Sequence, residues 1–456
     1  MFLNRKMPGM NLRRDLPKAL CGYFSFARRY FISKSNQISN EIRFLKLGFC
    51  IAFSVIIFTS EGQQKKLFIS GYVKDIKDNS FIPYANIYLK SAKKQGTVSN
   101  IEGSFKLLLP DNFAEDTLCI SYVGYQTKKK HILKNNVSDS VSIFLTEMPV
   151  VLNDVLVLGT TPLTFLKEAA KITSESCVSP AILNAYYREF ISKNGFFTKF
   201  ADAMVDYYVE YRGSKSSKVQ VRVAESRAKS VDVEIETKSG GNFDIPQQLD
   251  IESLPYFFDA QRKLNFVLEH GDNGDFYDFD LYEVAQDSDE FFKVVFSPKK
   301  GIEKLLFEGS FLINKESSVI HSVQYILPDS HKVYAKVYKL PFGFRVQQSA
   351  MNIYVQYQAI GDKYHLKFAK VSASLHVFDK KGLDITHAFS NEMLVNAIDY
   401  QSPKEFNSSE VWRKKSIVKR GNNYRTKFWE GQQGLMATEA EQKIIESLSN
   451  NNLSHE

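Results

Sequence analysis

Histidine and acidic side chains are the residues of this sequence best suited to metal chemistry, yet their spacing does not fit a zinc peptidase. A zinc carboxypeptidase needs His-x-x-Glu with a distant third histidine, and other zinc peptidases use His-Glu-x-x-His. No histidine is followed by glutamate three residues later. Neither Gly213-Ser214 nor Gly309-Ser310 completes the Gly-x-Ser-x-Gly elbow of serine hydrolases. We therefore expect no cofactor and neither of these enzyme classes. The histidines are residues 131, 270, 321, 331, 365, 376, 387 and 455.

An acidic cluster that follows His270 is the one candidate metal site. Hard cations such as Ca²⁺ prefer several carboxylate and carbonyl oxygens on a tight loop. The spacing departs from the EF-hand pattern, because Gly274 comes early and no glutamate closes the loop. Apolar residues between the acids also fit a strand after a turn, so a solvated hairpin is the favoured interpretation and calcium the alternative. The candidate ligands are Asp272, Asp275, Asp278 and Asp280.

A stretch rich in aromatic and acidic residues, 186–211, also has two interpretations. The aromatic rings could line a groove for a lipid or a glycan, but packing in the core of a curved sheet is favoured. The acids could supply the carboxylate pair of a glycosidase, although nothing in the sequence fixes their separation. These acids are Glu189, Asp202, Asp206 and Glu210, and the aromatic residues are Tyr186, Tyr187, Phe196, Phe197, Phe200, Tyr207, Tyr208 and Tyr211.

The net positive charge of the chain, +8, is confined to its N-terminal segment. Residues 1–49 hold ten of the 59 Lys and Arg and two of the 51 Asp and Glu, so the rest of the chain holds 49 of each. A body without net charge has no strong field to collect phosphates, which argues against a nucleic-acid partner. Behind the basic flank, the apolar run Leu47–Phe58 is followed by small residues at Ser60 and Gly62. This pattern predicts a secretory signal within residues 1–62, cleaved after Gly62, with a membrane anchor as the alternative.

Two cysteines, Cys119 and Cys177, lie beyond the signal. Export would permit a disulfide between them. The strand pattern around Cys119 suits a buried thiol equally well. The absence of a Cys-x-x-Cys pair gives no support to a zinc ribbon or a thioredoxin-like site.

Residues 66–147 have the pattern of an all-β sandwich. Short alternating segments are separated by turns rich in Gly, Asn and Asp. Gly103 and Gly124 fit turn positions that can require a positive φ. The expected strands are Phe68–Val73, Tyr84–Leu89, Gly96–Ser99, Ser104–Leu107, Leu118–Tyr122 and Val141–Leu145.

The segments ISGYVKD, PYANIYLK, GTVSNIEGSFKL and ISYVGY follow the order and spacing of the carboxypeptidase-regulatory-like module, which this part of the chain resembles. The resemblance implies a transthyretin-like β-sandwich of exported Bacteroidetes envelope proteins. It implies no peptidase activity, because the module accompanies carboxypeptidases without their catalytic groups. LNDVLVLG, residues 152–159, resembles the segment behind the same module in TonB-dependent receptors. A linker strand packed on the sandwich is the simpler interpretation.

The remainder of the chain predicts a second β-rich domain. Residues 148–180 should form a linker strand and a helix, because Thr164–Ser174 has helical apolar spacing behind Pro162. Residues 181–400 should form an antiparallel sheet that curls around a helix, and they resemble the half-barrel of lipoprotein-carrier-like periplasmic proteins. Residues 401–456 should form a tail with a short helix at Thr438–Leu448. The expected strands include Ala185–Phe190, Phe200–Tyr211, Val219–Val223, Phe291–Phe296, Leu305–Ile313, Val319–Ile326, Lys332–Leu340, Phe344–Tyr357, Tyr364–Phe378 and Glu392–Ile398.

These observations favour a mostly β protein of the periplasm or outer membrane with a binding or scaffolding role and no catalysis. Its expected partner is an envelope protein, a lipid or a glycan. A periplasmic carrier of lipid or lipoprotein, an outer-membrane receptor-associated component and an unrecognised hydrolase are the alternatives.

Overall fold

The computed structural model describes residues 66–137, 140–148, 159–213, 217–230, 251–286, 289–414, 416–420, 428–429 and 431–450. The predicted signal with its cleavage position Gly62, and residues 152–158 of the LNDVLVLG segment, lie outside the described residues. Within the described part of the chain, no helix is long and apolar enough to cross a membrane.

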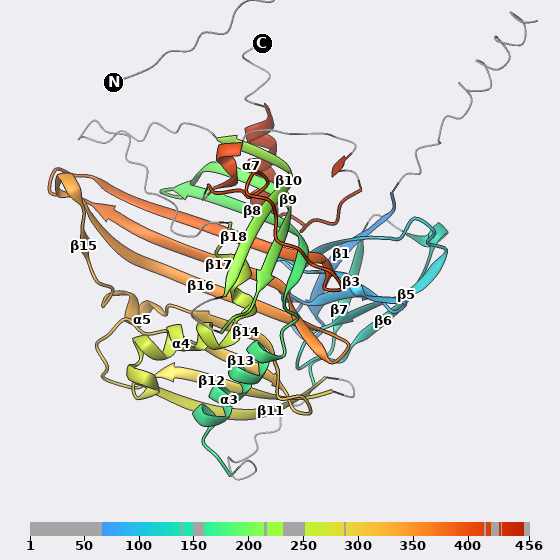
Figure 1. Cartoon of the computed structure of the whole chain (residues 1–456), viewed down its shortest axis with the longest axis horizontal. Helices are drawn as coiled ribbons and strands as arrows, with labels where there is room; N and C mark the ends of the chain where they lie inside the picture. The colour runs from blue at the N-terminus through green and yellow to red at the C-terminus, as the bar shows by residue number, and fades with distance from the viewer. Residues whose placement is uncertain are drawn as a thin grey trace, which may run out of the picture. The chain divides into compact units, whose positions relative to one another are not determined.

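The first domain is a sandwich of two small sheets, drawn in blue to cyan in Figure 1. One sheet has the order β4-β1-β7, in which β7 runs parallel to β1, and the other has the order β3-β2-β5-β6. Inward residues of both sheets form one hydrophobic core. Gly103 and Gly124 have φ values of 66° and 82°, which confirms the turn prediction. The strands are β1 Phe68–Asp75, β2 Asn86–Leu89, β3 Ala92–Val98, β4 Ser104–Leu108, β5 Glu115–Ser121, β6 Lys128–Leu133 and β7 Val141–Leu145.

The second domain is a large antiparallel sheet with the order β10-β9-β8-β18-β17-β16-β14-β13-β12-β11, to which the short β15 adds beside β16. Most neighbours in the sheet are also neighbours in sequence. There are two exceptions: β14 pairs with β16 rather than with the short β15, and β8 pairs with β18 and so joins the first strand of the domain to the last. The strands are β8 Ala181–Lys193, β9 Phe196–Glu210, β10 Lys218–Ser230, β11 Tyr277–Gln286, β12 Asp289–Pro298, β13 Glu308–Asn314, β14 Ile320–Ile326, β15 Tyr338–Lys339, β16 Arg345–Ile360, β17 Lys363–Phe378 and β18 Asp384–Asp399.

Two helices, α3 (Pro162–Glu175) and α4 (Ala260–His270), pack on the inner face of this sheet. Leu166 of α3 and Leu264 of α4 belong to the same buried cluster as inward residues of the strands. The hydroxyl of Tyr357 on β16 donates a hydrogen bond of 2.6 Å to the carbonyl of Phe257, just before α4. The sheet and the helices are therefore in direct contact. The predicted fold class, a mostly β chain with a curved antiparallel sheet around one or two helices, is confirmed.

The outer face of the sheet is covered by the sandwich and by the C-terminal segment. Tyr84 of the sandwich stacks on Tyr354 of β16, with ring centroids 4.2 Å apart. Leu435 packs against the same cluster. The side chain of Gln433 accepts a hydrogen bond from the Leu108 amide at 2.6 Å, and its carbonyl accepts one from Asn396 of β18 at 2.9 Å. Residues 431–438 thus fasten both domains together ahead of α7 (Glu439–Asn450).

Several local predictions need correction. Lys332–Leu340 was expected to be a strand, which is wrong: α5 (Asp329–Lys332) and the two-residue β15 occupy this region instead. The apolar alternation is misleading there, because Ala335 is the buried residue while its larger apolar neighbours are exposed. Helix α4 was not anticipated. Cys119 and Cys177 are buried thiols, so the disulfide alternative is wrong.

Candidate functional site

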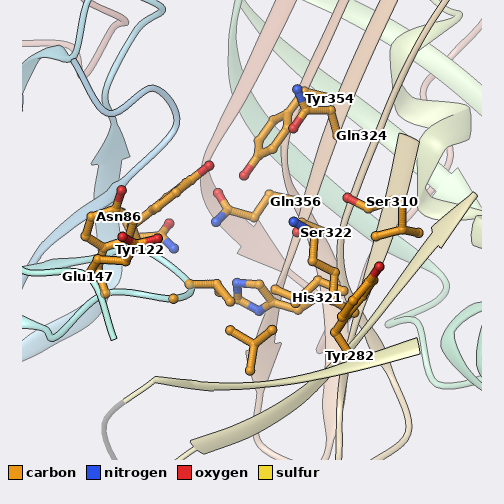
Figure 2. Close-up of a pocket in the computed structure, with 17 residues that line it drawn as sticks. Asn86, Tyr122, Glu147, Tyr282, Ser310, His321, Ser322, Gln324, Tyr354 and Gln356 are labelled. Carbon is orange, nitrogen blue, oxygen red and sulfur yellow. The ribbon is translucent and has the colours of Figure 1, made fainter. Parts of the chain in front are cut away.

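A cavity of about 500 Å³ lies between the sandwich and the outer face of the large sheet. The sandwich contributes the loop Tyr122–Tyr125, together with Asn86 and Glu147. The sheet contributes outward side chains of β11, β12, β13, β14 and β16. Figure 2 shows the two groups facing one another across the cavity.

The strands supply these side chains because residues alternate between the two faces of a sheet. On β16, Tyr354 and Gln356 line the cavity, whereas Ile353 and Val355 belong to the core around the helices. The same alternation on β13 turns Ser310 toward the cavity. The site is therefore the polar outer side of the strands whose inner side forms the main core.

A β-bulge adds His321 to the cavity. Leu312 pairs with Ser322, but the next residue of β13 pairs with Ile320, so His321 is the extra residue of β14. As a result His321 and Ser322 both line the cavity, while Ile320 stays in the core. Bulges can redirect a side chain in this way, and they are frequent beside functional sites.

The His321 ring is neutral at physiological pH. Burial lowers its pKa to about 4, and the ring packs edge-on against Phe291 with centroids 5.3 Å apart. A neutral imidazole offers one hydrogen-bond donor and one acceptor. His321 can therefore recognise a hydroxyl group without adding charge to the cavity.

Gln356 is the most deeply buried amide of the site. Its side chain is 3% exposed, and its Oε1 atom has no hydrogen-bond partner among the described residues. Figure 2 shows the amide projecting from the sheet toward the sandwich loop that carries Tyr122. A buried acceptor without a partner costs about 1–3 kcal/mol. A ligand that donates a hydrogen bond to Gln356 would remove that cost.

Tyrosine rings flank these polar groups. Tyr122 comes from the sandwich, Tyr354 from β16 and Tyr282 from β11. Burial raises the pKa of both Tyr122 and Tyr354, so their hydroxyls stay protonated and neutral. The sandwich loop is held by Tyr125, whose hydroxyl donates a hydrogen bond of 2.7 Å to Asp75 of β1.

A buried ionic network lies farther along the same outer face. Arg188 of β8 is 2% exposed and forms an ion pair with Glu392 of β18, which is 3% exposed. The Glu392 carboxylate also lies 2.7 Å from the Lys370 ammonium. Burial opposes the ionisation of Glu392, but Arg188 and Lys370 outweigh it and hold the pKa of Glu392 below its usual range. Glu441 of α7 lies 3.4 Å from Arg188, so the C-terminal helix completes the network.

The predicted acidic cluster is not part of this site. Asp272 and Asp275 lie at the short 3₁₀ turn η5 (Asp272–Gly274), whereas Asp278 and Asp280 lie on β11. None of the four lines the cavity. Across the described residues, no group of three or more His, Cys, Asp or Glu is arranged to hold a metal ion.

The aromatic and acidic stretch 186–211 is mainly structural. Tyr187 and Tyr207 lie in the main core, as the packing interpretation predicted. The carboxylates are engaged by neighbours: Glu189 accepts a hydrogen bond of 2.7 Å from the Tyr187 hydroxyl, and Asp202 pairs with Arg227. Asp206 pairs with Arg222 at 2.9 Å, and Glu210 with Arg212 at 2.6 Å.

Sequence reasoning missed the residues that line the cavity. The segments HSVQY and IYVQYQ place neutral polar side chains at outward positions of β14 and β16, which is a weak signal of a polar outer face. The bulge at His321 and the approach of the sandwich depend on tertiary structure, so no local pattern could indicate them.

Comparison with known proteins identifies the first domain alone. The family model of the CarboxypepD_reg-like domain matches residues 69–157, which confirms the domain and extends beyond the predicted boundary at residue 147. A search of curated proteins found no match.

Solved structures of three bacterial proteins are similar to the chain at low scores. A DUF1329 family protein from Desulfovibrio piger is 13% identical and covers 56% of this chain and 100% of its own, with a TM-score of 0.22. A LolA superfamily protein from Nitrosomonas europaea is 9% identical over 52% of this chain and 94% of its own, with a TM-score of 0.19. A protein of unknown function from Bacteroides fragilis is 10% identical over 73% of this chain and 98% of its own, with a TM-score of 0.15. None of these likenesses is close enough to indicate a function.

Proposed function

We propose that this chain is a non-catalytic binding protein of the cell envelope that holds a neutral carbohydrate in the cavity between its two domains. The observation that carries the proposal is the buried, unpartnered Oε1 of Gln356 at the cavity wall. The envelope location rests on the basic flank and apolar run at the N-terminus. It also agrees with the regulatory-like module.

The chemistry of the cavity favours a sugar over an ion. Its polar groups are mostly neutral amides, hydroxyls and the uncharged His321, each able to pair with a sugar hydroxyl. Tyr122 and Tyr282 offer rings on which the C–H face of a sugar can pack, whereas the Tyr354 ring is already stacked on Tyr84. The two charged residues at the cavity, Glu147 and Lys293, have opposite signs, so neither an anionic nor a cationic ligand is favoured. A volume of about 500 Å³ lies within the usual range for small-molecule sites.

A binding role fits the cavity better than glycoside hydrolysis. Hydrolysis of a glycosidic bond normally uses two carboxyl groups on either side of the bond. Among the described residues that line the cavity, Glu147 is the only acid. The carboxylates predicted as a possible pair, such as Asp202 and Glu189, are held by other side chains outside it.

A lipid carrier is the main alternative, and it makes a different use of the fold. An acyl chain would require an apolar space enclosed by the curved sheet. On that inner face, Tyr357, Leu366 and Phe257 pack together with the helices in one buried cluster. The cavity on the outer face presents polar groups instead, which suit a carbohydrate.

A glycan array probed with the labelled full chain tests the proposal. We expect binding to a subset of neutral glycans. Gln356→Leu, which keeps the size of the side chain but removes its polar atoms, should lose that binding, as should Tyr122→Ala. Gln348→Leu is the matched control, because Gln348 lies on the same strand outside the cavity. Native mass spectrometry of the purified chain is run in parallel. On the array, an equal signal for all variants or no glycan signal would contradict the proposal. In mass spectrometry, a phospholipid bound to the full chain and lost in Gln356→Leu would contradict it as well.

A further inference from the structure

The segment between β14 and β16 presents a concentrated apolar surface to solvent. Val333, Tyr334, Val337 and Tyr338 are 64%, 38%, 41% and 58% exposed. They are four of the thirteen large hydrophobic side chains that are exposed in the described residues, and they fall within six consecutive positions. Such clustering marks an interaction surface, whereas single exposed apolar residues need no explanation. We call residues 332–339 the basic-aromatic loop.

The basic-aromatic loop is fixed to the protein beneath it. The His331 ring is buried, and its Nδ1 lies 2.7 Å from the Lys304 carbonyl oxygen. At the middle of the loop, Ala335 is buried and its carbonyl accepts a hydrogen bond of 2.8 Å from the Gln347 side chain on β16. Hydrogen bonds therefore anchor the loop at its start and at its middle. The outward apolar side chains are carried by an ordered backbone.

Lysines alternate with the apolar side chains of the loop. Lys332, Lys336 and Lys339 are all exposed, and the Lys336 ammonium lies 5.3 Å from the centroid of the Tyr338 ring. Asp329, 2.8 Å from Lys332, is the only acid between residues 329 and 345. The loop therefore carries a net positive charge beside its apolar residues.

This combination suits a lipid surface better than a protein surface. Lysine is depleted at the centre of protein interfaces, where its charge would have to be desolvated. At a bilayer, lysines reach the phosphates while their methylene stems lie along apolar groups. Tyrosine is enriched at the level of the headgroups, and short aliphatic side chains enter the acyl boundary.

We propose that the basic-aromatic loop docks the protein on the surface of a bilayer that contains anionic phospholipid. Val333 and Val337 enter the boundary of the acyl chains, Tyr334 and Tyr338 lie among the headgroups, and Lys336 and Lys339 pair with phosphates. This surface is independent of the cavity that binds the proposed sugar. The protein would thereby hold its ligand close to a membrane.

Quenching of a local tryptophan by brominated lipid tests this contact in the full chain. Vesicles are made from brominated phosphatidylcholine and phosphatidylglycerol in equal parts. The fluorescence of the tryptophan introduced by Val337→Trp should be quenched much more than that of the native Trp412 and Trp429, because its indole would contact the brominated acyl chains. Phe196→Trp is the control, since Phe196 is 67% exposed but lies on β9. This readout reports contact by the loop even when the N-terminal apolar run also binds the vesicles.

Charge variants complete the test. When Lys336→Gln and Lys339→Gln are added to Val337→Trp, the concentration of anionic vesicles that gives half-maximal quenching should rise roughly 30-fold. Val333→Ser should weaken it further. The proposal is overturned if Val337→Trp is quenched no more than Phe196→Trp, or if the lysine changes have no effect. Self-association through the loop without vesicle quenching would assign the surface to a protein partner and equally overturn it.

Discussion

Replacing Glu392 by glutamine should destabilise the fold by about 3–5 kcal/mol, because it leaves two buried cations without their shared counter-charge. Arg188 is 2% exposed, and its Nε donates to Glu392 at 2.9 Å. Lys370 contacts the other carboxylate oxygen at 2.7 Å. Glu441, at 3.4 Å from Arg188, remains and compensates part of the loss, so the lower half of the range is expected. A folded protein is stable by only about 5–15 kcal/mol, and the effect should be obvious.

Urea unfolding followed by circular dichroism measures this change as a shift of the midpoint at constant slope. The control is Glu290→Gln, which removes one acid from an exposed pair with Lys315 at 2.9 Å and should cost less than about 1 kcal/mol. Adding Arg188→Met to Glu392→Gln should restore part of the loss, because it removes one of the stranded charges. A loss for Glu392→Gln no larger than that of the control would refute the reasoning.

Three further predictions concern the site and the junction between the domains. The free energy of unfolding should fall by up to about 3 kcal/mol as the pH drops from 6.5 to 4, because the unfolded chain protonates His321 in this window while the folded chain, with a pKa of about 4 for this ring, does not. Urea midpoints of His321→Gln should lack this contribution, and pH profiles that run parallel in the two proteins would contradict it. Gln433→Ala removes the hydrogen bonds to the backbone of Lys106 and Leu108, so hydrogen exchange of the amides of residues 431–438 should accelerate roughly tenfold or more. Unchanged protection of these amides would argue against a role of this segment in linking the two domains. Tyr84→Ala removes the ring stacked on Tyr354 and should lower the free energy of unfolding by about 3–5 kcal/mol. Calorimetry of this variant should then resolve separate unfolding transitions of the sandwich and the sheet, and a single transition would argue against coupling through this contact.

Local alternation was sufficient to predict most of the fold. β17 was predicted as Tyr364–Phe378 and spans Lys363–Phe378, because one face of the strand packs on the helices and the other faces outward. Helix α3 was located from its apolar spacing and Pro162. Where burial departs from alternation, prediction failed: β6 (KKKHIL) buries only Ile132, and the sequence gives almost no strand signal there.

The site was much less predictable than the fold. Gln356 looks like an ordinary outward residue of a strand, and only the tertiary structure places it opposite the sandwich residues that line the same cavity. His321 reaches the cavity through a bulge that exists only in the pairing of β13 with β14. The ionic network joins residues more than 200 positions apart, since Arg188 meets Glu392. Contacts of this kind depend on the assembled tertiary structure, which local patterns do not encode.

Isothermal titration calorimetry with the glycan that binds best on the array tests the role of the cavity most directly. The full chain and Gln348→Leu should bind it with equal affinity, and Gln356→Leu should bind at least tenfold more weakly because a buried hydrogen bond to the ligand is lost. Equal affinity of all three proteins would show that the sugar binds elsewhere and would contradict the proposed function.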